Sequence, residues 1–307
     1  MNYHAKYQTF LGHLGAWWHG YDFAALAAPA QQVAAFEDEE EDIPPPSGKA
    51  EWTPQRIAAL QMIFGDGEDS PAASKRCKEM IIPLGLNDQM SIVEIGCKLG
   101  TGLRVVAGSG GWIDGVEPED CFIEASKRLI VGAGLQKKAV PMNTSLSDER
   151  IQKHRRDAII SRESLHRYPD RLAVLQEAHD LLKPQGQMVF TEYVIDPMMD
   201  ETDLDDWLER HATPPKLVQL EELRSELIEV GFDVHVARDE TASFCADIIG
   251  ELQRFAATLK NNPTPKKING WVMTEVEYWA RTLSALESGA LLLARFHVIK
   301  TFDDPFS

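Results

Sequence analysis

The stretch Val93–Gly102, which reads VEIGCKLGTG, decides the fold of this chain. It begins inside a short β-branched run, Ser91–Gly96, which has strand character and ends in glycine. Glycines follow at positions 100 and 102, and a glycine-rich turn lets backbone approach a ligand closely. A helix that starts after such a turn favours negative charge at its N-terminus. The stretch therefore predicts a strand–turn–helix unit with a ligand at the turn.

Two common phosphate-binding patterns do not fit this turn. The dinucleotide fingerprint G-x-G-x-x-G fails because Lys98 takes the second glycine position after Gly96. It fails again in the later register, where Val105 stands in place of the glycine that should follow Gly100–Gly102. A Walker loop requires Gly-Lys-Ser/Thr, which does not occur in the chain. The ligand is therefore expected to be held in another way.

Strand-like runs alternate with helix-length amphipathic stretches along the chain. The further strand-like runs are Trp112–Glu117, Ala158–Ser161, Gln187–Tyr193, Phe232–Val236 and Leu292–Lys300. The amphipathic stretches between them are Cys121–Gly132, Asp170–Leu182 and Gln219–Val230. This alternation predicts a doubly wound α/β fold, with a mostly parallel, Rossmann-like sheet and helices on both faces. Ligands of such sheets bind beyond the carboxyl ends of the strands, at the switch point.

The second strand-like run ends in an acidic residue, Glu117, 21 residues after Gly96. A carboxylate in this place can accept hydrogen bonds from ribose hydroxyls, which predicts a ligand that carries a nucleoside. The alternative is that Glu117 is a solvated turn residue.

Charge and composition restrict the partners. The chain has 307 residues and a net charge of −17, which argues against binding through phosphates of nucleic acid or an anionic membrane surface. No run reaches the roughly 18 apolar residues of an integral membrane span. Four cysteines lie far apart in the sequence, which argues against a disulfide framework. Their spacing therefore predicts a reducing, cytoplasmic location. No metal-ligand spacing stands out.

We expect three parts in the chain: 1–50, 51–250 and 251–307. The first part is an aromatic arm with helical spacing from Tyr3 to Tyr21, followed by the acidic run Glu37–Asp42 and the Pro-rich run Pro44–Gly48. The arm could pack on the main domain, form a lid or a homodimer contact, or lie at an interface. The last part carries aromatics at helical spacing from Trp271, and it is expected to pack on the sheet or to form a homodimer contact or a substrate cap.

Five ordered motifs resemble those of the class I S-adenosylmethionine-dependent methyltransferases. They are Val93–Gly102, Gly115–Glu117, Asp157–Leu165, Leu181–Gln187 and Leu220–Phe232. The chain looks closest to small-molecule members of the sarcosine/dimethylglycine and phosphoethanolamine type. The resemblance implies S-adenosylmethionine as cofactor, S-adenosylhomocysteine as its product, and a small molecule or lipid head group as the acceptor at nitrogen or oxygen.

The resemblance also implies roles for particular residues. The turn residues Glu94, Gly96, Cys97, Gly100 and Gly102 would surround the methionine end of the cofactor, and Glu117 would hold its ribose. Further contacts would come from residues flanking the adenine or facing the substrate, namely Pro118, Asn143, Thr144, Ser161 and Arg162.

Four residues near the expected site bear on activity. His166 is the candidate general base, against the alternative of a surface or capping histidine, and Tyr193 is a second catalytic candidate or a packed strand residue. Lys98 replaces the second glycine of the family, and Arg167 stands where the family often has histidine. These departures leave open a catalytically inactive, methyltransferase-like protein with a binding or regulatory role.

Overall fold

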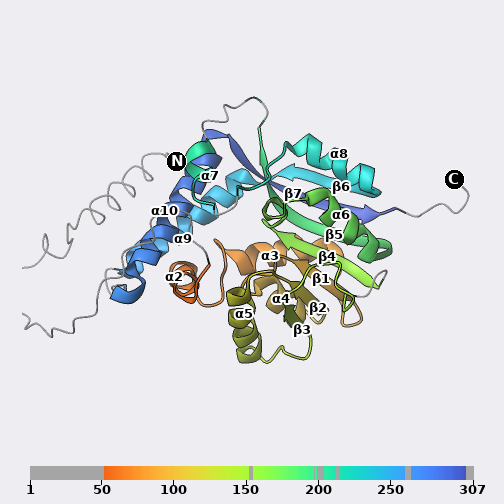
Figure 1. Ribbon diagram of the computed structural model, residues 1–307, viewed down its shortest axis with the longest axis horizontal. Helices are drawn as coiled ribbons and strands as arrows, with labels where there is room; N and C mark the ends of the chain where they lie inside the picture. The colour runs from red at the N-terminus through yellow and green to blue at the C-terminus, as the bar shows by residue number, and fades with distance from the viewer. Residues whose placement is uncertain are drawn as a thin grey trace, which may run out of the picture.

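The computed structural model describes residues 52–151, 155–196, 198, 204–211, 214–259 and 264–301. Its centre is a seven-stranded sheet in the order β3-β2-β1-β4-β5-β7-β6 (Figure 1). The strands are β1 (Ser91–Ile95), β2 (Trp112–Val116), β3 (Ala139–Met142), β4 (Arg156–Arg162), β5 (Leu182–Ile195), β6 (Phe232–Asp239) and β7 (Leu291–Lys300). The expected N-terminal arm lies outside the described residues.

Strands β1 to β5 run parallel to one another, and β7 pairs antiparallel with both β5 and β6. The chain order reverses between β1 and β4, which makes the carboxyl ends of these two strands the switch point of the sheet. The predicted mostly parallel, doubly wound sheet is confirmed. β7 confirms the strand expected at Leu292–Lys300.

Helices cover both faces of the sheet. On one face, α3 (Ala73–Ile81), α4 (Thr101–Gly108) and α5 (Asp120–Gly132) share a buried apolar cluster with β1, β2 and β4. On the other face, α6 (Arg171–Leu181) and α8 (Leu220–Val230) share a second cluster with the central strands. Two 3-10 turns, η2 (Ile82–Leu84) and η3 (Leu165–Arg167), complete this part.

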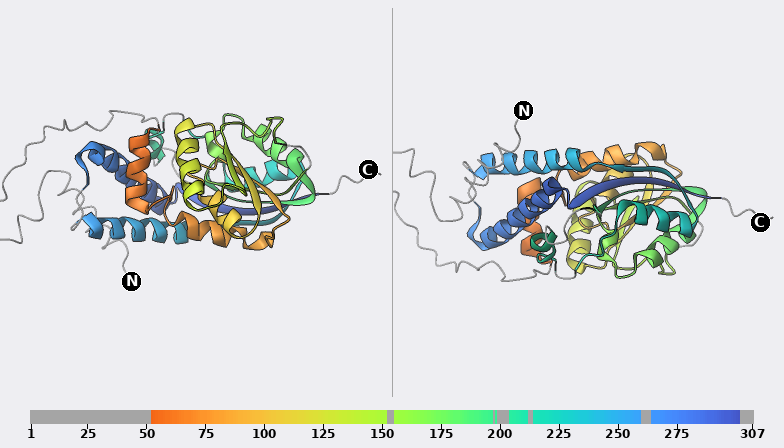
Figure 2. Two further views of the ribbon diagram at one scale, coloured as in Figure 1. Left: turned by 90° about the horizontal axis from the view of Figure 1, so that it is seen from below. Right: turned by 90° about the horizontal axis from the view of Figure 1, so that it is seen from above.

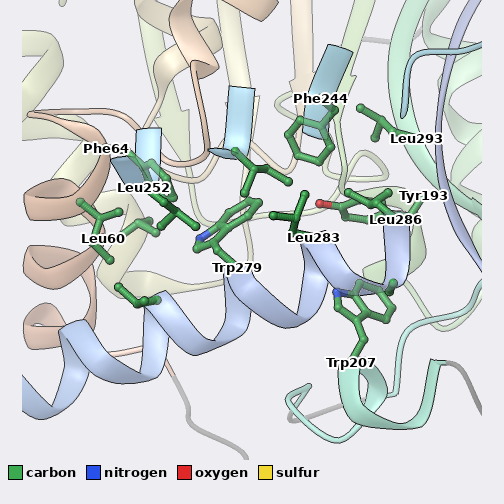
Figure 3. Close-up of a cluster of buried hydrophobic side chains, with 14 of the residues drawn as sticks. Leu60, Phe64, Tyr193, Trp207, Phe244, Leu252, Trp279, Leu283, Leu286 and Leu293 are labelled. Carbon is green, nitrogen blue, oxygen red and sulfur yellow. The ribbon is translucent and has the colours of Figure 1, made fainter. Parts of the chain in front are cut away.

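A separate lobe of helices stands at one end of the sheet (Figures 1 and 2). It consists of α2 (Pro54–Phe64), the short α7 (Asp205–Leu208), α9 (Thr241–Leu259) and α10 (Lys266–Ser288). Trp279 of α10 packs edge-on against Phe64 of α2, with ring centroids 5.2 Å apart, and lies beside Phe244 of α9 (Figure 3). The lobe thus has its own apolar core.

Some local predictions were wrong or incomplete. β3 was not recognised, because it has four residues and contains Pro141, which an edge strand tolerates. α9 continues to Leu259, and Phe255 is buried within it. α10 packs mainly on α2 and α9 rather than on the sheet. The division into three parts stays a prediction, and its boundary at residue 250 falls inside α9.

Candidate functional site

A cavity of about 750 Å³ lies between the carboxyl ends of the strands and the helical lobe. The sheet side contributes Lys98 from the turn after β1, Pro118 and Glu119 after β2, and a group of residues after β4. The lobe contributes Trp52, Arg56, Glu275, Tyr278 and Trp279. The cavity therefore opens at the switch point, where ligands of doubly wound sheets bind.

The glycines of the turn allow neighbouring elements to approach it closely. Gly96 has a φ of +67°, and a Cβ there would lie 2.4 Å from Oγ of Ser164 after β4. A Cβ on Gly102, at the start of α4, would lie 2.3 Å from Oε1 of Glu94 on β1. These two positions fix the turn against the loop after β4 and seat α4 on the end of β1.

An ionic network lies buried beside this turn. Both guanidinium NH2 groups of Arg162 donate to the carboxylate of Asp69, at 3.0 and 2.9 Å, and its Nε donates to Glu94 at 3.2 Å. Burial alone would raise the pKa of Asp69, but the Arg162 charge outweighs it and lowers that pKa to about 2. Burial, together with the charge of Asp69, raises the pKa of Glu94 to about 7 against the opposing charge of Arg162. The second oxygen of Glu94 has no hydrogen-bond partner among the described residues.

The acid at the end of β2 is already paired. Arg167 donates to both oxygens of the buried Glu117 carboxylate, at 3.0 and 3.3 Å, and the backbone N–H of Lys98 donates to it at 3.1 Å. Lys98 itself has a φ of +45°, in the left-handed region that favours glycine. Its ammonium group reaches the backbone oxygen of Glu163 after β4, at 3.4 Å.

A histidine–glutamate pair forms the wall below the lobe. Nδ1 of His166 lies 2.5 Å from Oε1 of Glu192 on β5, and the other oxygen of Glu192 accepts the backbone N–H of Leu165 at 2.5 Å. Tyr193 packs on His166, with ring centroids 5.4 Å apart, and burial raises its pKa well above the usual value. Since Glu192 engages Nδ1, Nε2 is the ring nitrogen of His166 left for a substrate proton.

A second imidazole, His211, lines the same cavity. Its Nδ1 lies 3.0 Å from the carbonyl oxygen of Trp207, which can only accept, so Nδ1 carries the proton and Nε2 a lone pair. Burial, with the nearby His166, lowers the pKa of His211 to about 4. His211 is therefore neutral at pH 7.

The structure places the residues expected at the site in three groups. His166, Tyr193 and Pro118 line the cavity. Fully or nearly fully buried residues of the strands and turn lie beneath it, namely Glu94, Cys97, Glu117, Ser161 and Arg162. Asn143 is exposed and donates to the backbone oxygen of Pro118 at 3.3 Å, while Thr144 donates to Asp148. The contacts of all these residues with a ligand stay predictions.

Sequence reasoning missed several residues that line the cavity or support its lining. Glu192 lies at an inward position of β5, and no motif marks it as the partner of His166. His211, Tyr278, Trp279 and the ion pair of Arg56 with Glu275 come from the lobe. These groups are brought to the cavity by the packing of α2, α7 and α10 within the lobe, which joins segments far apart in sequence.

The fold and this site define a Rossmann-like α/β protein with a cavity at its switch point, beside a glycine turn and a strand-end acid. The chain belongs to the methyltransferase domain family, whose profile matches residues 72–236, more than half of the chain. Within the described residues, no helix has both the length and the apolar character needed to cross a bilayer.

Individual proteins are similar to the chain at low identity. Phosphoethanolamine N-methyltransferase 1 of Zea mays is 23% identical over 201 residues, which are 65% of this chain and 39% of that protein. The chain thus spans less than half of the length of the curated relatives it matches.

Solved structures share the fold. Phosphoethanolamine N-methyltransferase 2 of Haemonchus contortus, in complex with phosphomonomethylethanolamine and S-adenosylhomocysteine, has a TM-score of 0.71 at 18% identity. The match covers 81% of this chain and 58% of that one. A Galdieria sulphuraria protein assigned as a sarcosine dimethylglycine methyltransferase has a TM-score of 0.61 at 18% identity, over 74% of this chain and 84% of that one.

Proposed function

We propose that the chain transfers a methyl group from S-adenosylmethionine to nitrogen or oxygen of a small molecule or lipid head group. The observation that carries the proposal is the cavity at the switch point, which joins the glycine turn to the His166–Glu192 pair. The names of the similar proteins, phosphoethanolamine and sarcosine dimethylglycine methyltransferases, support an amine as acceptor.

The residues of the cavity fit this cofactor once Arg167 turns away from Glu117. Glu117 would then accept the ribose hydroxyls, and Pro118, Glu119 and Phe122 would line the adenine. The cofactor supplies an activated methyl group.

The protein's own part in the reaction is positioning and proton removal. In-line displacement gains much of its rate from orientation, which the closed cavity between sheet and lobe provides. An acceptor that arrives protonated needs a base, and Nε2 of His166 fills this role because Glu192 holds the ring by Nδ1. Tyr193, whose hydroxyl stays protonated at neutral pH, is a hydrogen-bond donor there rather than a base.

Location and assembly are part of the proposal as well. The four cysteines are free, which supports a reducing compartment such as the cytoplasm, and the charge of −17 supports a small-molecule acceptor rather than nucleic acid. Trp279 of α10 is buried in the lobe, which leaves the N-terminal aromatic arm as the better candidate for a homodimer contact.

A second function is favoured by the pairing of Glu117 with Arg167. A chain that keeps the strand-end acid permanently occupied would be a methyltransferase-like binding or regulatory protein without activity. Calorimetric titration of S-adenosylmethionine and S-adenosylhomocysteine into the full chain separates the two. Micromolar binding of both supports the enzyme, and absence of binding at millimolar ligand contradicts it.

A further inference from the structure

Glu117, the acid at the carboxyl end of β2, is paired with a side chain of the protein, Arg167. Arg167 holds both of its oxygens through two guanidinium nitrogens, at 3.0 and 3.3 Å. Glu117 is fully buried, while the side chain of Arg167 is 24% exposed and lines the cavity. A bidentate guanidinium uses the same carboxylate lone pairs that a ribose diol would use. Arg167 and a ribose therefore cannot both hold Glu117.

Lys98 also lines the cavity, beside the Arg167–Glu117 pair. Its backbone N–H donates to Glu117, and its ammonium group reaches the backbone oxygen of Glu163. The side chain thus runs along the cavity from the turn after β1 to the loop after β4. Asp69 and Glu163 lie close enough to Lys98 to act on its charge. An ammonium group at this position occupies the backbone oxygen of Glu163, an acceptor that the α-ammonium of an amino-acid ligand could use.

We infer that Arg167 and Lys98 are internal competitors of S-adenosylmethionine, which binds only when the Arg167–Glu117 pair opens. The inference rests on the proposed function, because it concerns the cofactor of that function. The pair lies at the inner wall of the cavity, so salt screens it little. The free energy needed to open the pair therefore lowers the affinity for the ligand at any salt concentration. The α-ammonium and the ribose of the cofactor each meet one of the two competitors.

The test compares cofactor affinity among single variants of the full chain. S-adenosylmethionine and S-adenosylhomocysteine are titrated by calorimetry into wild type, Arg167→Gln, Lys98→Gly and the control Arg224→Gln. Arg224 forms an exposed pair with Glu221 on α8, far from the cavity in the fold. We expect Arg167→Gln and Lys98→Gly each to lower Kd by about tenfold or more, and Arg224→Gln to leave Kd unchanged.

Two further variants separate charge from shape. Arg167→Lys keeps the charge but cannot hold both oxygens, so its affinity should lie between wild type and Arg167→Gln. Lys98→Met keeps a long side chain without the charge, and should recover less affinity than Lys98→Gly. Thermal unfolding of each free variant checks that it is folded. If Arg167→Gln does not fold, Arg167→Lys and the two Lys98 variants carry the test.

The outcomes distinguish the inference from the function on which it rests. Measurable binding with equal Kd in wild type and all variants overturns the competition and leaves the function standing. Weaker binding by Arg167→Gln would show that Arg167 helps to hold the cofactor, and it also overturns the inference. No binding by any variant at millimolar ligand overturns the proposed function together with the competition.

Discussion

Nε of Arg56 lies 2.5 Å from Oε1 of Glu275, and this buried ion pair joins α2 to α10 across the helical lobe. The guanidinium of Arg56 also lies over the ring of Trp52, 3.8 Å from its centroid. All three residues line the cavity. The pair therefore ties the two helices that form the outer wall of the candidate site.

Removing one partner of this pair should destabilise the lobe strongly. Glu275→Ala removes the carboxylate that accepts from Nε of the buried Arg56 guanidinium, and breaking a buried pair by removing one partner costs about 3–5 kcal/mol. We expect a loss of that order in the free energy of unfolding, measured by urea denaturation. The control is Glu124→Ala, which removes an exposed pair with Lys127 and should change stability by less than about 1 kcal/mol. Similar small losses in both variants would contradict the prediction.

The contact of Gly102 with Glu94 predicts a sharp difference between two glycines of α4. Gly102→Ala puts a Cβ 2.3 Å from a carboxylate held by Arg162, so the helix or the network must shift, at a cost of about 1–3 kcal/mol. Gly108, in the same helix, has nothing within 4 Å of an added Cβ. Gly108→Ala should be neutral or stabilising by up to about 1 kcal/mol. Chemical denaturation of both variants measures the difference, and equal effects would count against it.

The buried network gives stability a dependence on pH. The pKa of Glu94 is raised from 4.5 to about 7 in the folded protein. Between these values the folded state binds more protons than the unfolded state, so the contribution of Glu94 to stability falls as pH rises from 4.5 to 7. The fall amounts to about 3 kcal/mol for this group.

Glu94→Gln should remove this part of the pH dependence. The free energy of unfolding, measured at pH 5 and pH 7.5 in wild type and variant, should fall less in the variant over this range. Asp69 acts in the opposite sense and at lower pH. Its pKa is lowered to about 2, so its contribution is present above 3.8 and is lost as pH falls toward 2. An unchanged difference between pH 5 and 7.5 in Glu94→Gln would rule out Glu94 as the source.

The proposed base should affect turnover without affecting cofactor binding. His166→Ala should lower kcat by about 100-fold or more on an acceptor amine, with the Kd of S-adenosylmethionine unchanged. Glu192→Gln keeps the shape of the pair but weakens its hold on Nδ1, so it should lower kcat less and shift the pH–rate profile. Ser225→Ala on α8 serves as control, since this exposed hydroxyl bonds only its own helix among the described residues. A normal kcat in His166→Ala would remove His166 from the reaction.

Much of the parallel sheet could be predicted, because buried strands leave a local signal. Ser91–Ile95 and Ala158–Ser161 are short apolar runs next to glycine or polar turns, and they became β1 and the middle of β4. β3 gave no such signal, since four residues with a proline fit many structures. Its place at the edge of the sheet is fixed by pairing with β2.

The site could be predicted only where it follows from position along a strand. Glu117 was predicted at a strand end, and it lies there. Its partner Arg167 was visible as a departure from the family, yet the pairing depends on how the η3 turn after β4 places a side chain at the end of β2, which β1 separates from β4 in the sheet. His211 and Trp279 enter the cavity through packing between segments far apart in sequence, and no local pattern records that packing.

The position of β7 has a consequence for how the chain is made. β7 follows both β5 and β6 in sequence, yet it lies between them and pairs with both. While the protein is being synthesised, β5 therefore keeps an open edge, and β6 has no partner in the sheet until residue 300 has left the ribosome. The same delay holds for the candidate site, because α10, which walls it, directly precedes β7. A nascent chain stalled before this point would expose the unpaired edge of β5. Chaperones would have to protect this form from aggregation.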